Sequence, residues 1–206
     1  MMGLDQNITN AFKNAFERNC FQLIIEAYQL AVSEKIIQLD WEENDITSEL
    51  HDLIDRNEQR ARWRISTNVE SHLHNKNVKK EKGYASKLPR IDLRMVTFNK
   101  KEECKYYFEA KNLKAADSKL KRRYIKTGID HFISKKYGNG SLIGYLIEGS
   151  LDSTINGLNK LLEKDNRKPE TLKPKTCRLY PHYYESEHEG IGVLKHLIFD
   201  FSNNLE

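Results

Sequence analysis

The chain of 206 residues contains little cysteine, little proline and no long hydrophobic run. Its cysteines (Cys20, Cys104 and Cys177) are scattered, odd in number and form no CxxC pair, which argues against a disulfide scaffold and a zinc ribbon. No segment approaches the ~18 uncharged apolar residues that a membrane-spanning helix needs. The first residues lack the basic and apolar regions of a secretory signal. These absences predict a protein of a reducing compartment, the cytoplasm, with no membrane partner.

Positive charge is concentrated in one quarter of the chain. Residues 76–126 hold 17 lysines and arginines against 6 acidic residues, whereas the rest of the chain is net negative. This block could face a polyanion, because phosphate contacts supply salt-dependent affinity, or it could be a solvated face of a lysine-rich protein. The side chains that we expect to contact nucleic acid are Lys114, Lys119, Lys121, Arg122, Arg123 and Tyr124.

The apolar pattern predicts a single domain of mixed α/β class over residues 1–206, with a central sheet flanked by helices. We expect a helical N-terminal extension (1–40), a core (41–150), and a C-terminal helix and strands that complete the sheet (151–206). Helices are predicted over 8–39, with a break near Asn19 or Ser33, from about Asp45, and over 117–136 and 151–163. Strands are predicted over 62–73, 90–98, 104–113, 141–149, 176–185 and 194–201.

Two carboxylates and a lysine are expected on one face of a β-hairpin. Asp92 lies in the strand 90–98, and Glu109 and Lys111 lie two residues apart in the next strand, so alternation gives them a common face. Paired carboxylates can hold Mg²⁺ through oxygen ligands. A nearby ammonium can orient a metal-bound water and offset charge that grows on a phosphate, which suits phosphodiester hydrolysis. The alternative is a salt-bridge ladder on a solvated sheet face.

Glu49 is a further candidate. In the helix that begins near Asp45, it lies three residues after Ile46 and four before Leu53, at the edge of the predicted buried stripe. A carboxylate there needs a partner, because an unpaired buried charge is costly, and a metal site at the sheet edge would supply one. Alternatively, Glu49 is stabilised by its place near the helix N-terminus or reaches solvent.

The array Glu49, Asp92 and Glu109-Ala110-Lys111 resembles the PD-(D/E)xK nuclease superfamily, over about residues 40–150. The resemblance implies a restriction-endonuclease-like fold, in which helices flank a mixed central sheet. The chain departs from the family pattern before Asp92, where Arg90-Ile91 stands in place of a proline, although Pro89 lies close. Within the superfamily it looks most similar to small bacterial defence or restriction proteins, through softer matches at Tyr124, Gly128, Tyr137 and Ser186-x-His188.

The resemblance also implies roles for the site residues. Asp92, Glu109 and Glu49 would bind Mg²⁺, with Mn²⁺ as a substitute, and the carbonyl of Ala110 would add a ligand. Lys111 would position and activate the attacking water. The expected function is a DNA endonuclease of bacterial defence or restriction that acts on duplex DNA, with a second copy of the chain or a partner protein supplying targeting.

Two other functions stay open. The chain could be a nucleic-acid-binding or scaffold subunit that keeps the nuclease fold and needs a partner, or its substrate could be RNA or a single strand. The sequence also leaves the roles of His182 and His188 open, between substrate contact and a hydrogen-bonded structural role.

Overall fold

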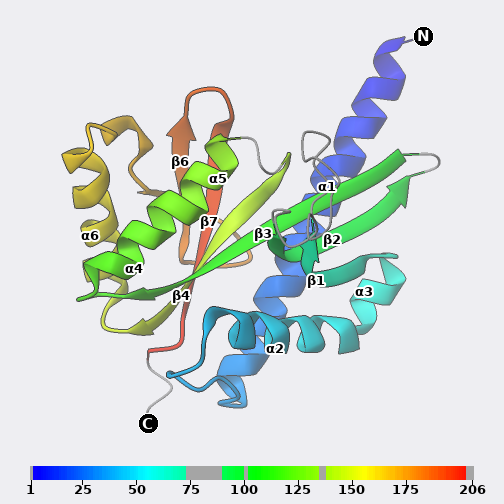
Figure 1. The fold of residues 1–206 in the computed structure, drawn as a ribbon. Coiled ribbons are helices and arrows are strands. Elements are labelled where there is room, and N and C mark those ends of the chain that lie inside the picture. The colour runs from blue at the N-terminus through cyan, green and yellow to red at the C-terminus, as the bar shows by residue number, and fades with distance from the viewer. Residues whose placement is uncertain (1, 73–89, 100–101, 135–137, 203–206) are drawn as a thin grey trace, which may run out of the picture.

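The computed structural model describes residues 2–72, 90–99, 102–134 and 138–202 (Figure 1). Helices in these residues are α1 (Met2–Ser33), α2 (Glu43–Arg56), α3 (Glu58–Arg62), α4 (Ser118–Arg123), the π-helix η2 (Tyr124–Ile129), α5 (Asp130–Ile133), α6 (Leu151–Lys164) and the 3₁₀ helix η3 (Lys168–Glu170). The strands are β1 (Ser66–His72), β2 (Arg90–Asn99), β3 (Glu102–Lys114), β4 (Gly140–Glu148), β5 (Lys173–Pro174), β6 (Tyr183–His188) and β7 (Gly192–Asp200). Tyr137 and Pro89 lie outside the described residues.

The strands form one mixed sheet in the order β1-β2-β3-β4-β7-β6-β5. β4 lies at the centre and is parallel to both β3 and β7, whereas the pairs on either side of this unit are antiparallel. Parallel neighbours need a crossover connection, and the helices α4 to α5 and then α6 provide the two crossovers. Because β4 pairs directly with β7, the expected core and the expected C-terminal part share one sheet.

A hydrophobic core lies on each face of the sheet. Alternate residues of β4 divide between them: Ile143 and Tyr145 pack with α1 and α2, whereas Leu142 and Leu146 pack with the helices from α4 to α6. Figure 1 shows the same division, with α1 and α2 on one side of the sheet and α4, α5 and α6 on the other. The predicted class, a mixed α/β sheet flanked by helices with an N-terminal helix, is confirmed.

The first helix begins and ends about six residues earlier than predicted, and it is more central to the fold. It runs without the break considered near Asn19 and ends at Ser33. Its second half supplies core residues from Phe16 to Ala31, so only the first half is an extension (Figure 1). Continuous burial on the sheet explains why the helix passes Asn19 unbroken, since tertiary packing supplies most helical stability in proteins. None of the helices in the described residues has the length and apolar composition needed to cross a membrane.

Candidate active site

The site forms where β3 continues beyond the end of its pairing with β2. The ladder between these strands ends at the pair Leu93 and Phe108, so the following amides on that edge of β3 lack strand partners from β2. Carboxylates take their place: Asp92 Oδ2 accepts from the amide of Ala110 at 2.7 Å, and Glu43 Oε2 accepts from the amide of Asn112 at 3.1 Å. The divergence of two strands therefore brings two carboxylates to one short stretch of backbone.

Lys111 lies at the centre of this cluster. Its Nζ is 2.9 Å from Glu43 Oε1, 2.9 Å from Glu109 Oε1 and 3.5 Å from Asp92 Oδ2. It also donates to the carbonyl of Ala110. Glu109 and Lys111 are each only 4% exposed, so they do not lie on a solvated sheet face as the alternative interpretation required.

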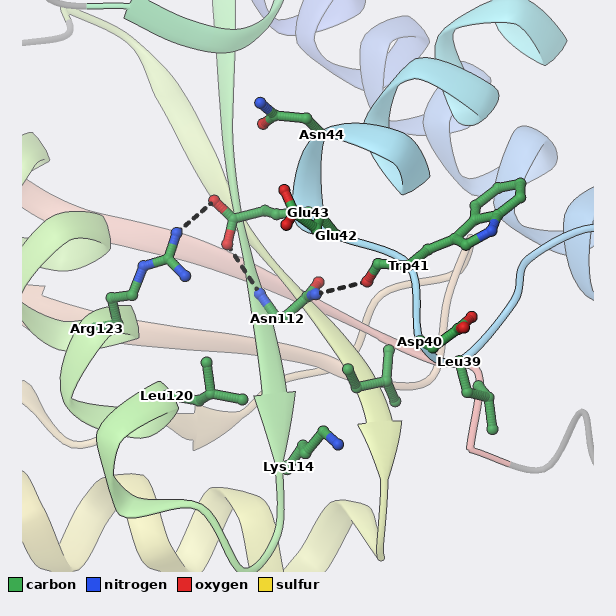
Figure 2. Close-up of a pocket in the computed structure, with 11 residues that line it drawn as sticks. Leu39, Asp40, Trp41, Glu42, Glu43, Asn44, Asn112, Lys114, Leu120 and Arg123 are labelled. Atoms are coloured by element: carbon green, nitrogen blue, oxygen red, sulfur yellow. Dashed lines mark hydrogen bonds and ion pairs between the residues drawn. The ribbon is translucent and has the colours of Figure 1, made fainter.

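The N-terminus of α2 delivers Glu43. The side-chain amide of Asn112 donates through Nδ2 to the carbonyl of Trp41 at 3.2 Å, and the hydroxyl of Thr47 donates to the carbonyl of Glu43 at 2.8 Å. The same Thr47 hydroxyl hydrogen-bonds to the hydroxyl of Tyr145 on β4 at 3.0 Å. Figure 2 shows the Glu43 carboxylate between Arg123 and the backbone of Asn112. The first turn of α2 is thus fixed to both β3 and β4.

Burial and like charge alter the electrostatics of the cluster. Desolvation, followed by repulsion from Glu109, raises the pKa of Asp92 to about 6. Burial alone would lower the pKa of Lys111, but its carboxylate neighbours, chiefly Asp92 and Glu109, outweigh that effect and raise it to about 12. Lys111 is therefore a fixed positive charge near neutral pH, and Asp92 begins to protonate on mild acidification.

Two further basic side chains border the cluster. Arg123 of α4 reaches Glu43 Oε1 at 3.3 Å while its side chain remains 52% exposed. His131 of α5 lies with Nδ1 3.7 Å from Glu109 Oε1. Both come from the helices that connect β3 to β4, and this crossover therefore forms the second wall of the site.

Glu43, rather than the predicted Glu49, joins the cluster. Glu49 lies six residues further along α2, which at 1.5 Å per residue is about 9 Å of helix axis. Among the described residues, Glu49 makes no hydrogen bond or ion pair with Asp92, Glu109 or Lys111. The sequence signal that could have found Glu43 is an acidic residue in the first turn of α2, but Asp45 in the same turn shares it and Glu42 at the N-cap is also acidic.

The predicted nucleic-acid contacts divide into two groups. Tyr124 and Lys121 are buried, with Tyr124 OH bonded to His196 and Lys121 Nζ donating to the carbonyl of Ala115, so neither side chain is exposed for a nucleic acid to contact in this structure. Arg122 is ion-paired with Asp165. Lys114, Lys119 and Arg123 keep access to solvent, and Lys114 pairs with Glu148 at the surface.

Two cavities flank the carboxylates. A cavity of about 430 Å³ adjoins Glu43 and is lined by residues 39–44, Asn112, Lys114, Leu120, Arg123 and Ile147 (Figure 2). A second one, of about 260 Å³, adjoins Asp92 and is lined by Asn44, Asp45, Thr47, Ser48, Val69 and Asp92. Because Asn44 lines both, the start of α2 separates them, and Glu43 borders one cavity while Asp92 borders the other.

The donor set suits a hard divalent cation. Glu43, Asp92, Glu109 and the carbonyl of Ala110 offer only oxygen, which Mg²⁺ prefers. Within the described residues, no three His, Cys, Asp or Glu side chains are already arranged around one metal position. The carboxylates converge instead on the Lys111 ammonium, so a cation would have to share them with this lysine.

A second polar chain is buried on the other side of β4. Ser186 Oγ lies 2.6 Å from His188 Nε2 and 2.7 Å from His196 Nε2, and His196 Nδ1 hydrogen-bonds to Tyr124 OH at 2.9 Å. His188 Nδ1 is 2.7 Å from Glu170. The serine, histidine and glutamate match a nucleophilic triad in connectivity, but Ser186 is 1% exposed and closed to a substrate. The structure therefore gives His188 a hydrogen-bonded structural role.

Comparisons of the chain with protein-family models, with curated proteins and with solved structures found no match.

Proposed function

We propose that this chain is a metal-dependent nuclease of PD-(D/E)xK type that hydrolyses phosphodiester bonds in DNA, with a cytoplasmic role in bacterial defence or restriction. The observation that carries the proposal is the convergence of Glu43, Asp92 and Glu109 on the buried Lys111. The mixed sheet with parallel centre and antiparallel edge hairpin is compatible with a restriction-endonuclease-like fold. Targeting by a second copy or a partner protein remains part of the proposal.

The charge balance supports this chemistry. One ammonium faces three carboxylates, and the half-exposed Arg123 neutralises only part of the remaining negative charge. Retaining such a cluster in a protein interior is costly unless it is paired, so a cation-binding role explains its presence. A Mg²⁺ or Mn²⁺ ion would act there as a Lewis acid and lower the pKa of a water molecule.

The chain's own groups have distinct tasks in this proposal. Glu43, Asp92 and Glu109 hold the cation, and the amides of Ala110 and Asn112 orient two of these carboxylates. Lys111 orients the attacking water and offsets the charge that grows on the phosphate. Arg123, at the solvent side of Glu43, contacts the phosphate backbone.

Cleavage of a supercoiled plasmid tests the proposal. We expect nicking with Mg²⁺ or Mn²⁺ but not with EDTA, and a loss of at least ~10²-fold in Lys111→Ala, because proton-transfer and water-orienting groups contribute that much. Lys160→Ala, an exposed lysine of α6, serves as the matched control and should cleave normally. Glu43→Gln should lose more activity than Glu49→Gln. The proposal is contradicted if the Lys111→Ala variant still cleaves. It is also contradicted if the protein binds nucleic acid without metal and cleaves none, and that result would favour the scaffold function.

A further inference from the structure

The cavity beside Glu43 lies one residue beyond the catalytic lysine. Asn112, which follows Lys111 on β3, and Lys114 form its base, and Figure 2 shows α4 with Leu120 and Arg123 on one side and the segment from Leu39 to Glu43 on the other. A substrate bound with its phosphate at Lys111 would therefore place the next nucleotide over this cavity.

The size of the cavity favours a single nucleotide. At about 430 Å³ it falls within the ~300–1,000 Å³ of pockets that hold drug-sized molecules, and one nucleotide is such a molecule. A base pair is about twice as large, and the stack around it would prevent entry. Of an unpaired nucleotide and a base pair, only the unpaired nucleotide therefore fits this space.

The chemistry of the walls matches the parts of a nucleotide. Arg123 is exposed enough to exchange Glu43 for a phosphate, and Leu120 and Ile147 provide apolar contacts for a sugar or base. The opposite wall carries the acceptors Asp40 and Glu42, which would repel a phosphate and attract base N–H groups.

A buried acceptor gives a second, independent sign of a ligand. Asn112 Oδ1 is buried and finds no hydrogen-bond partner among the described residues, although the amide nitrogen of the same side chain is bound to Trp41. That bond fixes the orientation of the amide, so its oxygen stays at the cavity wall, where a ligand N–H or O–H donor can reach it once the atoms that cover it move aside. A buried acceptor without a partner is costly, and a ligand donor would satisfy it.

We propose that this cavity binds an unpaired nucleotide next to the scissile phosphate, so that the preferred substrate is single-stranded DNA or DNA with an unpaired base at the cleavage position. Arg123 contacts the adjoining phosphate and Asn112 Oδ1 accepts from the nucleotide. The inference rests on the proposed nuclease function and narrows its substrate.

Binding without cleavage tests the inference separately from catalysis. Fluorescence anisotropy in EDTA compares a mixed-sequence single-stranded DNA oligonucleotide with a blunt duplex of the same length. We expect the wild type to bind the single strand more tightly than the duplex. Arg123→Gln should lower the affinity for the single strand by about tenfold, the effect of one charge-assisted contact. Leu120→Trp, which fills the cavity, should weaken single-strand binding with little change for the duplex. Arg62→Gln, an exposed ion-paired arginine of α3, is the matched control and should bind both normally.

Several results would overturn the inference. Equal affinity of the wild type for the two DNAs would do so. Arg123→Gln and Leu120→Trp variants that lose the same affinity for both DNAs would also do so. Thermal denaturation confirms that the variants are folded. A cleavage arm with Mg²⁺ separates the two proposals. Lys111-dependent cleavage of duplex and single strand at equal rates would sustain the nuclease and reject the unpaired nucleotide. The expected binding pattern without cleavage of either DNA would sustain the cavity assignment and reject the catalytic function.

Discussion

Lys111 compensates three carboxylates at once, and that makes it a stabilising residue as well as a candidate catalytic one. Its ammonium lies within 3.5 Å of Glu43, Asp92 and Glu109, and its side chain is 5% exposed. Removing one partner of a buried ion pair usually costs more than the pair contributes, because the remaining charge has no partner. The cluster is therefore stable only with a cation at its centre, either this ammonium or an added ion.

Replacing this lysine should destabilise the protein in a way that a divalent cation reverses. We expect Lys111→Met to lower the free energy of unfolding by about 3–5 kcal/mol in EDTA, the cost of breaking a buried pair. Millimolar Mg²⁺ should then raise the melting temperature of the variant more than that of the wild type, because binding to the native state alone is stabilising. Lys160→Met is the control. A variant that melts like the wild type in EDTA would show that the carboxylates need no compensating charge.

For individual residues, the sequence predicted the members of the site only where the alternation of side chains along a strand applies. Asp92, Glu109 and Lys111 were predicted together because alternation along two adjacent strands gives side chains a common face. Glu43 was missed, because its place depends on where α2 meets the free edge of β3, a contact between residues 69 positions apart. Tyr124 and Lys121 were predicted to contact nucleic acid, but both are buried, because charge density along the sequence does not reveal which side of a helix is buried.

Among the elements, α2 has the most direct influence on the site. Thr47 links its first turn to the central strand through Tyr145, and both hydroxyl-bearing residues are buried. Since the same Thr47 hydroxyl donates to the carbonyl of Glu43, this bond also holds the backbone that carries a site carboxylate. The position of Glu43 therefore depends on a contact that lies outside the acidic cluster.

A double-mutant cycle measures this contact. Thr47→Val leaves the Tyr145 hydroxyl buried without its partner, so we expect a loss of about 1–3 kcal/mol in the free energy of unfolding by urea. Tyr145→Phe removes that hydroxyl, and the double variant should lose less than the sum of the single ones. Additive losses would mean that the two hydroxyls do not stabilise each other.

The central strand is also closely packed at Gly144. A Cβ on this residue would lie 2.5 Å from Leu113 Cδ1 and 2.9 Å from Ile198 Cδ1, both on buried side chains of the neighbouring strands. Gly144→Ala should therefore lower the free energy of unfolding by about 1–3 kcal/mol, as overpacking does, and thermal unfolding measures this change. Gly138→Ala adds a Cβ with no atom within 4 Å and is the matched control. Equal stability of the two variants would contradict this packing argument.

The elements themselves were predictable to different degrees. The apolar run of β4 and the alternation of β2 and β3 identified these strands with ends close to those observed. The strand predicted over 176–185 begins only at Tyr183, and the two-residue β5 is too short for any periodicity. The order β3-β4-β7 could not be predicted, because pairing between distant strands is decided by burial on both faces and not by local pattern.

For the whole molecule, the buried chain from Tyr124 to Glu170 links stability to pH. His196 is fully buried between Tyr124 and Ser186, with His188 facing it across the serine, and desolvation lowers its pKa to about 3. Desolvation also lowers the pKa of His188, opposed by Glu170. Between pH 3 and the unfolded value of ~6.5, the unfolded state thus binds more protons at His196 than the folded state does.

Stability should therefore fall as pH decreases below ~6.5, by about 2 kcal/mol from His196 at pH 5. Asp92 acts in the opposite direction between its unfolded pKa of ~3.9 and about 6, because its raised folded-state pKa favours the folded state as pH decreases. His196→Gln separates the two effects, since it keeps a neutral hydrogen-bonding side chain and leaves Asp92 unchanged. Urea denaturation at pH 7.5 and pH 5 should show that the free energy of unfolding falls less between these pH values in the variant than in the wild type. This comparison holds whatever the absolute stabilities of the two proteins. The same pH dependence in both proteins would mean that another group, with His188 the first candidate, carries the acid sensitivity.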